Sequence, residues 1–285
     1  MSGTLFLVAT PIGNLEDMTF RAVRVLREVA LIAAEDTRRT GTLLAHYQIA
    51  TPTTSLHDHN ERSRVPTLVK HLQAGENLAV VTDAGMPSIS DPGYLMVTAA
   101  LEVGAQVEVI PGASALTTAI AGSGLPADLV AFRGFAPART GERDRFFSEF
   151  RQIPGTAVFF EAPHRLRESL KSLLENAGDR RVAIAHELTK LHESWHRGFV
   201  SQLIADKGLP EKGEFTVVVG EEVRKLDGHK QADSLDPQAI ALEFGELTKT
   251  SGLDRREALS ELARRHQVPK RSVYALIERA KKLAE

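Results

Sequence analysis

The sequence predicts an α/β protein with two α/β domains, a ligand cleft between them, and a small all-helical module at the C-terminus. Three observations support this prediction. Apolar, β-branched strands alternate with helical patterns over the first part of the chain, which is typical of a parallel sheet covered on both faces. Later strands follow one another with little helix between them, which favours a mixed or antiparallel sheet. The last part has helical periodicity only.

The predicted boundaries follow from these changes of pattern. The segment 122–126 marks the crossing between the two α/β domains, and the segment near residue 230 has no periodicity, as expected of a linker. We therefore expect an N-terminal domain with a parallel sheet at 1–121, a C-terminal domain with a mixed sheet at 122–224, a linker at 225–235 and a helical module at 236–285.

The composition excludes several classes of protein. With 285 residues, 42% of them hydrophobic and 25% charged, the chain is long enough for two globular cores. No apolar run approaches the ~20 residues that span a bilayer, and the N-terminus lacks the basic start of a signal peptide. The absence of cysteine excludes disulfides, thiolate metal sites and cysteine nucleophiles. These features together indicate a cytoplasmic protein.

The alternation can be followed element by element. In the first domain we expect strands at 4–9, 31–34, 52–56, 77–81 and 105–110. Asp17 or Thr19 should cap the first helix, and the helix that opens near residue 57 should break or kink at Pro66. In the second domain we expect strands at 129–132, 156–160, 181–186, 194–200 and 214–219, and helices at 143–150, 166–176 and 201–205.

One loop stands out, the segment Thr82–Gly93 with the sequence T-D-A-G-M-P-S-I-S-D-P-G. It follows a buried strand, and open α/β sheets bind ligands at the carboxyl ends of their strands. Most loops of this kind have 2–6 residues, so this longer, glycine- and proline-rich loop favours a binding function over a simple connection. Asp91 and Pro92 should open the next helix, as its N-cap and its first residue.

The class of ligand follows from motifs that the chain lacks. Strand one is followed by T-P-I-G-N-L, without the G-x-G-x-x-G glycines, and no G-x-x-x-x-G-K-[ST] loop occurs. The loop at 82–93 and the small-residue turn Pro111–Ser114 instead suit a cofactor held by backbone groups and by shape. We expect no metal, because His57 and His59 fit the polar start of a helix better and no H-E-x-x-H helix is present.

Polar clusters follow several of the expected strands, namely Glu35–Arg38, Glu161–Arg165, Glu187–Lys190 and Glu193. Each lies where the carboxyl edge of a sheet should face the cleft. Some of them can be explained as helix caps. The repeated arginines and lysines also suit a substrate with phosphates, and the carboxylates, histidine and lysine suit a general base.

The C-terminal region is basic although the whole chain has a net charge of −2. Residues 249–285 contain ten lysines and arginines against five acidic residues, which indicates a polyanionic partner. Two helices joined by a short turn at 266–269 have the shape of a helix-turn-helix. Helical hairpins are also common packing units, so this pattern alone leaves nucleic-acid binding open.

Taken together, the motifs resemble a known family. The segments Val8–Thr19, Ala34–Thr40, Asp83–Gly93, Pro111–Ala115, Phe160–Leu166, Glu187–Lys190 and Lys212–Thr216 occur in this order, and the resemblance covers essentially residues 3–220. They are similar to motifs of the tetrapyrrole (corrin/porphyrin) methylase superfamily, in its bacterial branch that methylates ribose 2′-oxygens of small-subunit ribosomal RNA. Met86 is a departure, because the family usually has threonine there.

The resemblance implies an enzyme that binds S-adenosylmethionine between its two domains, forms a homodimer and methylates a decoding-centre cytidine, cytidine 1402 of 16S rRNA. The tail would then bind RNA. The expected cofactor-binding residues are Pro11, Gly13, Asp83, Ala84, Gly85, Met86, Ile89, Ser114, Ala115, Phe160, Glu161 and Thr216.

The remaining roles are assigned by chemistry. The candidates for the base that removes the hydroxyl proton are Glu187, Lys190, Asp36 and His164, with no preference among them. The expected RNA-binding residues are Arg38, Arg165, Arg264, Arg265, Lys270 and Arg271. Two alternatives stay open, a methylase of small tetrapyrroles and an RNA-binding module without enzymatic activity. The basic tail argues against the first, and the glycine/proline loop argues against the second.

Overall fold

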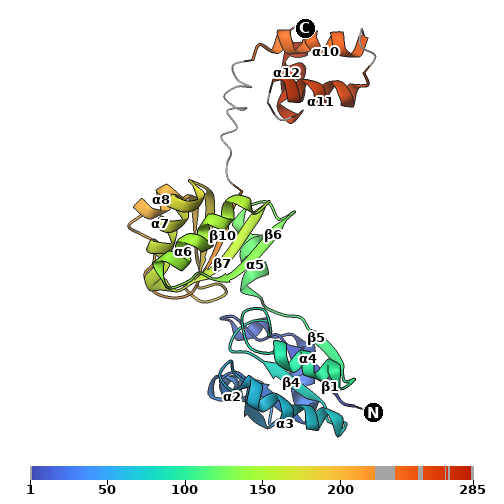
Figure 1. Ribbon diagram of the computed structural model, residues 1–285, viewed down its shortest axis with the longest axis vertical. Coiled ribbons are helices and arrows are strands. Elements are labelled where there is room, and N and C mark those ends of the chain that lie inside the picture. Colours follow the sequence, from blue (N-terminus) through green and yellow to red (C-terminus); the bar gives the residue numbers. More distant parts are fainter. Residues whose placement is uncertain (1, 222–234, 250–252, 267, 269, 284–285) are drawn as a thin grey trace. The chain divides into compact units, whose positions relative to one another are not determined.

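The computed structural model describes residues 2–221, 235–249, 253–266, 268 and 270–283 (Figure 1). For residue 271 and residues 281–283 it describes only the backbone. The chain divides into two compact units, Met1–Glu222 and Val223–Glu285. Apart from Leu235, the predicted linker lies outside the described residues. No helix among the described residues is both long and apolar enough to cross a lipid bilayer.

The first sheet is fully parallel, as the alternating pattern predicts, with the strand order β3-β2-β4-β1-β5. Its strands are β1 (Thr4–Val8), β2 (Leu31–Ala34), β3 (Thr53–Ser55), β4 (Leu78–Val81) and β5 (Gln106–Ile110). The connecting helices are α1 (Phe20–Glu28), α2 (Thr37–His46), α3 (Glu61–Gln73) and α4 (Tyr94–Glu102), with a 3₁₀ turn η1 (Leu15–Asp17) before α1. Thr19 caps α1 through its side chain, so Asp17 does not.

Side chains alternate across this sheet and form two apolar layers. Leu78 and Val80 of β4 belong to the layer that includes α3 and α4. Ala79 and Val81 belong to the opposite layer, which includes α1 and α2. The central strand is therefore buried on both faces, which explains its uninterrupted apolar sequence. We call these five strands with α1–α4 the first lobe.

The second sheet is mixed, with the order β6-β7-β10-β8-β9. Only β6 and β7 pair in parallel, and the other neighbours are antiparallel. The strands are β6 (Val130–Phe135), β7 (Thr156–Glu161), β8 (Arg181–His186), β9 (Ser194–Phe199) and β10 (Phe215–Val219). The helices are α5 (Ala115–Ser123), α6 (Thr140–Ser148), α7 (Leu166–Ala177) and α8 (Val200–Ala205), with 3₁₀ turns η2 (Glu149–Gln152) and η3 (Pro163–Arg165).

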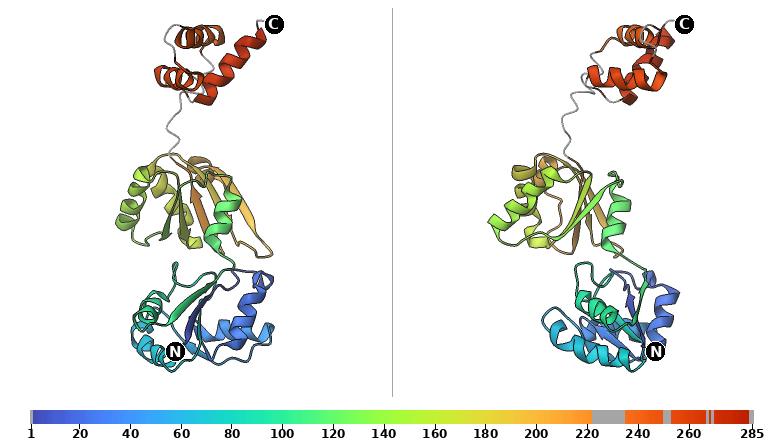
Figure 2. Two further views of the ribbon diagram at one scale, coloured as in Figure 1. Left: turned by 90° about the vertical axis from the view of Figure 1, so that its right-hand side faces the viewer. Right: turned by 45° about the vertical axis from the view of Figure 1, so that its right-hand side comes forward.

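Helices cover both faces of the second sheet (Figure 2). Helices α6–α8 contribute to the layer around Phe159, and α5 packs on the opposite face with Val158 and Val218. The predicted domain boundary at residues 121 and 122 thus falls inside α5, a helix whose contacts are with β8 and β10. We call this sheet with α5–α8 the second lobe.

Two expectations concern the helices of the first lobe. Helix α3 continues past Pro66 to Gln73, so the expected break is wrong, whereas the alternative, a kink at Pro66, stays a prediction. Its buried residues Val65, Leu68 and Leu72 anchor it in the apolar layer, and this packing outweighs the hydrogen bond that the proline removes.

Asp91 and Pro92 do not open helix α4, which begins at Tyr94 with Gly93 as its N-cap. The cap interaction comes from a different element. The buried carboxylate of Glu61 in α3 accepts hydrogen bonds from the N–H groups of Gly93 at 2.9 Å and Leu95 at 3.2 Å. Because another side chain satisfies these orphan donors, Asp91 is left free to lie outside the helix.

The C-terminal unit contains α10 (Pro237–Lys249), α11 (Arg255–Arg265) and α12 (Lys270–Leu283). Their apolar faces share one core. Asp254 and Glu257 form a reciprocal capping box at the start of α11. The helix break expected at Ser251 and Gly252 lies outside the described residues.

The core of the second lobe provides a stability prediction. Phe147 is fully buried and makes edge-to-face contacts with Phe146, Phe150 and Phe159. Its replacement by alanine should lower the free energy of unfolding by about 3–5 kcal/mol. Phe20→Ala is the matched control, because that ring is 99% exposed, and it should change stability by less than about 0.5 kcal/mol. Equal effects of the two substitutions in denaturant titrations would contradict this packing.

Candidate active site

A cavity of about 430 Å³ lies between the first and second lobes. The first lobe contributes residues from the ends of β1, β2 and β4, and the second lobe contributes residues from α5, β6, β7 and the segment before β10. Its lining is Ile12, Glu35, Arg39, Asp83, Ala84, Gly85, Met86, Ile89, Ser90, Asp91, Ser114, Ala115, Leu116, Phe135, Phe160, Glu161, Ala162, Pro163, Leu188, Gly213, Glu214, Phe215 and Thr216.

The topology of the first sheet explains this position. Helices α1 and α2 lie on one face of the sheet, and α3 and α4 lie on the other. The neighbouring strands β1 and β4 therefore send their connections to opposite faces, which opens a crevice at their carboxyl ends. Across this crevice Thr10 and Gly85 form a two-residue bridge, with N···O distances of 2.9 Å and 3.0 Å. The bridge joins the loops that follow the two strands.

The loop at 82–93 is shaped by its backbone. Gly85 has a φ of +83°, and Ser88 has a φ of +69°, which is unusual for a residue with a side chain. Gly93 has a φ of +132°, and a Cβ there would lie 2.5 Å from Ser88 Oγ. Positive φ values therefore favour glycine at positions 85 and 93, and the loop curves around one side of the cavity.

The carboxylate of Asp83 connects three segments of the first lobe. Its Oδ1 accepts a hydrogen bond from the N–H of Asp36 at 3.1 Å, and its Oδ2 pairs with Arg39 at 3.0 Å. Its own N–H donates to Glu35 Oε2 at 3.1 Å. These bonds join the end of β4 to the end of β2 and to helix α2. The negative charge of Asp83 is therefore committed to positioning these loops.

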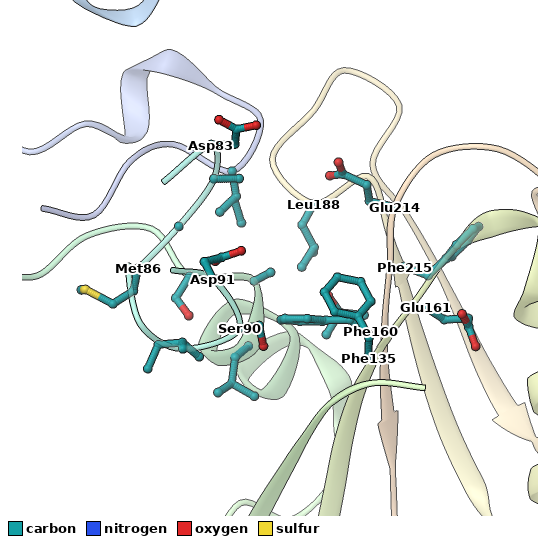
Figure 3. Close-up of a pocket in the computed structure, with 18 of the residues that line it drawn as sticks. Asp83, Met86, Ser90, Asp91, Phe135, Phe160, Glu161, Leu188, Glu214 and Phe215 are labelled. Atoms are coloured by element: carbon teal, nitrogen blue, oxygen red, sulfur yellow. The ribbon is translucent and has the colours of Figure 1, made fainter. Parts of the chain in front are cut away.

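Asp91 is in a different situation, because its side chain points into the cavity (Figure 3). Burial raises the pKa of Asp91 to about 6, with smaller contributions from the nearby carboxylates Glu35, Asp58 and Asp83. Burial also raises the pKa of Glu35. One side of the cavity is therefore rich in negative charge, and a cationic group that enters it is stabilised there.

Aromatic rings form the opposite side of the cavity. Phe160 makes edge-to-face contacts with Phe132 at 5.0 Å and with Phe135 at 5.3 Å between ring centroids. Phe135 is 58% exposed although it lines the cavity. Behind the rings, the buried carboxylate of Glu161 pairs with Arg165 at 2.8 Å and accepts a hydrogen bond from Ser169. The cavity thus has an aromatic side and an acidic side.

A loop after β8 lies beside the aromatic side and carries Glu187 and Lys190. Lys190 Nζ pairs with Glu187 at 2.9 Å and with Glu214 at 3.0 Å. Burial acts to lower the pKa of Lys190, but its two carboxylate partners outweigh burial and raise it. Burial acts to raise the pKa of Glu187, but hydrogen bonds from Lys190 and the Glu214 N–H lower it overall. Both groups are therefore held in their charged forms.

The structure brings most of the predicted cofactor-binding residues together. Asp83, Ala84, Gly85, Met86, Ile89, Ser114, Ala115, Phe160, Glu161 and Thr216 all line the cavity. Pro11 lies in a smaller adjoining pocket with Arg39 and Asp83, and Gly13 lies against Lys190. The side chain of Met86 points away from the aromatic side (Figure 3). The binding roles of these residues remain predictions.

The four candidate bases occupy different places. Asp36 caps α2, and hydrogen bonds from Arg38 hold its pKa well below the usual range. Glu187 and Lys190 pair with each other, and His164 is exposed on η3. None of these four is among the residues that line the cavity. Arg39, Ser90, Leu188 and Glu214 also line the cavity; they lie in segments that the sequence singled out, but they were not predicted as site residues. Leu116 and Phe135 lie outside these segments and reach the cavity only through tertiary packing.

The predicted RNA-binding cations have varied partners. Arg38 is 90% exposed and pairs with Asp36, whereas Arg165 is mostly buried against Glu161. In the C-terminal unit Arg264 and Arg265 are exposed and both contact Glu261, and Lys270 is exposed. The side chain of Arg271 lies outside the described residues. Within the described part of the chain, no group of three or more histidine, aspartate or glutamate side chains could hold a metal ion.

Comparisons with known proteins identify the family. The model of the family "Tetrapyrrole (Corrin/Porphyrin) Methylases" matches residues 4–204. A curated relative from Streptococcus pyogenes serotype M1, named ribosomal RNA small subunit methyltransferase I, is 42% identical and covers 96% of this chain and 94% of its own. A relative of the same name from Synechocystis sp. is 43% identical and covers 96% and 97%. The chain therefore belongs to the tetrapyrrole methylase family, in the branch of the ribosomal RNA small subunit methyltransferases I.

Solved structures support the fold. Uroporphyrin-III C-methyl transferase from Thermus thermophilus, in a structure complexed with S-adenyl homocysteine, has a TM-score of 0.53 at 21% identity and covers 78% of this chain and 100% of its own. A diphthine synthase has a TM-score of 0.58 at 13% identity and covers 76% and 90%. The predicted fold class, two α/β units with a cleft and a helical C-terminal region, is confirmed.

The cap supplied by Glu61 provides a second stability prediction. Glu61→Ala leaves the N–H groups of Gly93 and Leu95 without their acceptor, and this should lower the free energy of unfolding by about 1–3 kcal/mol. Amide hydrogen exchange at residues 93–95 should accelerate as well. Glu61→Gln is the matched control, because it keeps an acceptor oxygen and should lose less. If exchange at these amides were unaffected by Glu61→Ala, the cap would be refuted.

Proposed function

We propose that this protein transfers a methyl group from S-adenosylmethionine to the ribose 2′-oxygen of cytidine 1402 in 16S rRNA. The observation that carries the proposal is the 42–43% identity, over nearly the full chain, to relatives named for small-subunit ribosomal RNA methylation. The cavity at the carboxyl ends of β1 and β4 supplies a binding site of suitable size and character.

The residues that line the cavity fit the cofactor. The backbone of Asp83–Ile89 and the turn at Ser114 and Ala115 can hold it through N–H and C=O groups, and Phe135 and Phe160 offer faces for its adenine. Gly85 lines the cavity and has no side chain, so a ligand can lie against its backbone; a Cβ there would be in van der Waals contact with Ile12 Cγ2 at 3.5 Å and Ala113 O at 3.8 Å. When bound, S-adenosylmethionine supplies a methyl group on a positively charged sulfur.

The chain itself has three tasks in such a reaction. The loop at 82–93 and the second lobe hold the two reactants so that oxygen, methyl carbon and sulfur lie in line. Such alignment can provide effective molarities of about 10⁵–10⁸ M. The apolar residues Ile12, Leu116 and Phe160 line the cavity and would limit the access of water to the reactants. Proton removal from the ribose hydroxyl contributes a further factor of about 10²–10⁴.

The helical C-terminal unit is proposed to bind the RNA. Among the side chains that the structure describes there, the exposed cations are Lys249, Arg255, Arg256, Arg264, Arg265, Lys270 and Arg279. Arginine and lysine side chains on short helices contact phosphates, which positions an RNA substrate without reading its sequence. We also propose that the enzyme acts as a homodimer in the cytoplasm, where small ribosomal subunits are assembled.

Methyl transfer can be tested directly. Purified protein is incubated with methyl-labelled S-adenosylmethionine and either small ribosomal subunits from cells that lack this methylation, naked 16S rRNA, or a tetrapyrrole. The proposal predicts label in rRNA and, by mass spectrometry of nuclease fragments, a 2′-O-methyl group on cytidine 1402. Label in the tetrapyrrole would support a small-molecule methylase instead, and RNA binding without label would support a non-enzymatic module.

Gly85 provides a test of the cofactor site. Gly85→Leu places a side chain in the cavity at a φ of +83° and should abolish binding of S-adenosylmethionine in calorimetry. Gly104→Leu is the matched control, because Gly104 has a φ of +71° and open space around its Cβ. Both variants carry the same type of backbone strain, so only the first should lose affinity. Equal affinities of the two variants would place the cofactor elsewhere.

Removal of the C-terminal unit tests its proposed role. A chain ending at residue 235 keeps both lobes and their cores and should bind S-adenosylmethionine with unchanged affinity. Its affinity for rRNA should fall, and the slope of log K against log salt should decrease by about 0.7–0.9 for each phosphate contact that is lost. If rRNA affinity and the salt slope of the truncated chain matched those of the full chain, this role would be excluded.

A further inference from the structure

Asp91 is a carboxylate of the cavity that does not help to hold the described part of the fold together. Its side chain points into the cavity (Figure 3), and no described residue forms a hydrogen bond or ion pair with it. The other carboxylates around the cavity differ. Glu35 accepts a hydrogen bond from the Asp83 N–H. Asp83 pairs with Arg39, Glu161 with Arg165, and Glu214 with Lys190. A half-buried carboxylate without a partner costs stability, so its retention in the cavity indicates a role toward the ligand.

We propose that Asp91 is the general base of the methyl transfer and accepts the proton of the substrate hydroxyl. This inference rests on the proposed function. The O–H bond of the hydroxyl breaks and its proton bonds to the Asp91 carboxylate, while the oxygen uses the released electron pair to bond the methyl carbon. The bond between sulfur and carbon breaks, and its electron pair stays on sulfur, which becomes neutral. Asp91 then releases its proton to water.

The geometry separates Asp91 from the four candidate bases that were predicted from the sequence. Asp36 caps α2 and binds Arg38, so its oxygens are engaged. Glu187 accepts hydrogen bonds from Lys190 and from a backbone N–H, and Lys190 is held as an ammonium ion, which cannot accept a proton. His164 is exposed on η3 and does not line the cavity. Asp91 has free lone pairs inside the cavity.

The surroundings of Asp91 suit a base that works near neutral pH. Charged groups face it from several elements: Glu35 after β2, Asp58 before α3, Asp83 after β4, Arg39 of α2, and, across the cavity, the Glu161–Arg165 and Glu214–Lys190 pairs. Burial together with the three nearest carboxylates raises its pKa to about 6. An efficient general base has a pKa just below the working pH, because it is then deprotonated and still basic.

The test is Asp91→Asn in single-turnover methyl transfer to small ribosomal subunits at saturating S-adenosylmethionine, measured from pH 5 to 9. The wild-type rate should rise with pH along an acid limb at or below about pH 6, since the bound sulfonium cation lowers the pKa of Asp91. Asp91→Asn should lower the rate about 10²–10⁴-fold and remove this limb. Its affinity for S-adenosylhomocysteine in calorimetry should stay within about threefold of wild type, which also shows that the variant is folded.

Asp58→Asn is the matched control, because Asp58 is exposed and does not line the cavity. Loss of the Asp58 charge should move the acid limb to lower pH and leave the plateau rate unchanged. If Asp91 had only a structural role, this shift would not occur.

A wild-type rate or an unchanged acid limb in Asp91→Asn would overturn the inference. The inference would also be overturned if Asp91→Asn lost affinity for the cofactor but transferred the methyl group at the wild-type rate at saturating S-adenosylmethionine. Asp91 would then bind the positive charge of the cofactor. If the wild-type protein itself transfers no methyl group to the subunits, the proposed function fails and this inference fails with it.

Discussion

The site depends on one carboxylate, that of Asp83. It accepts a hydrogen bond from the backbone of Asp36 and pairs with Arg39, so the ends of β2 and β4 and the start of α2 are held in one arrangement. The bridge between Thr10 and Gly85 adds the end of β1. Without these bonds, the loops that follow neighbouring parallel strands, whose connections run to opposite faces of the sheet, would be independent of one another. These few bonds make the carboxyl edge of the first sheet a rigid side of the cavity.

The two lobes contribute different chemistry to that cavity. The first lobe supplies backbone groups in strained but well-packed turns and a set of carboxylates. The second lobe supplies the aromatic rings of Phe135 and Phe160 and cations that are already paired with acids. A ligand with a flat ring at one end and a positive charge near the other is complementary to this arrangement. The arginines near the cavity, Arg39 and Arg165, are paired with Asp83 and Glu161.

The sequence predicted the parallel first sheet, the mixed second sheet and the position of the loop at 82–93. The spacing of apolar residues and the content of glycine and proline, on which these predictions depend, are local properties of the chain. The sequence could not predict which side chain caps α4. Glu61 takes that role from a distance of more than thirty residues along the chain, and Asp91 consequently faces the cavity. Helix α5 follows the first sheet in the sequence but packs on the second. The pairing of Lys190 with Glu214 likewise depends on tertiary packing.

Binding of the cofactor by both lobes in one cavity is tested most directly by hydrogen exchange of the full chain, with and without S-adenosylhomocysteine. We expect slower exchange in peptides covering 82–93 and, to a similar extent, in peptides covering 160–163 and 213–216, with no change in peptides from α12. Protection confined to one lobe, or located away from these segments, would contradict it.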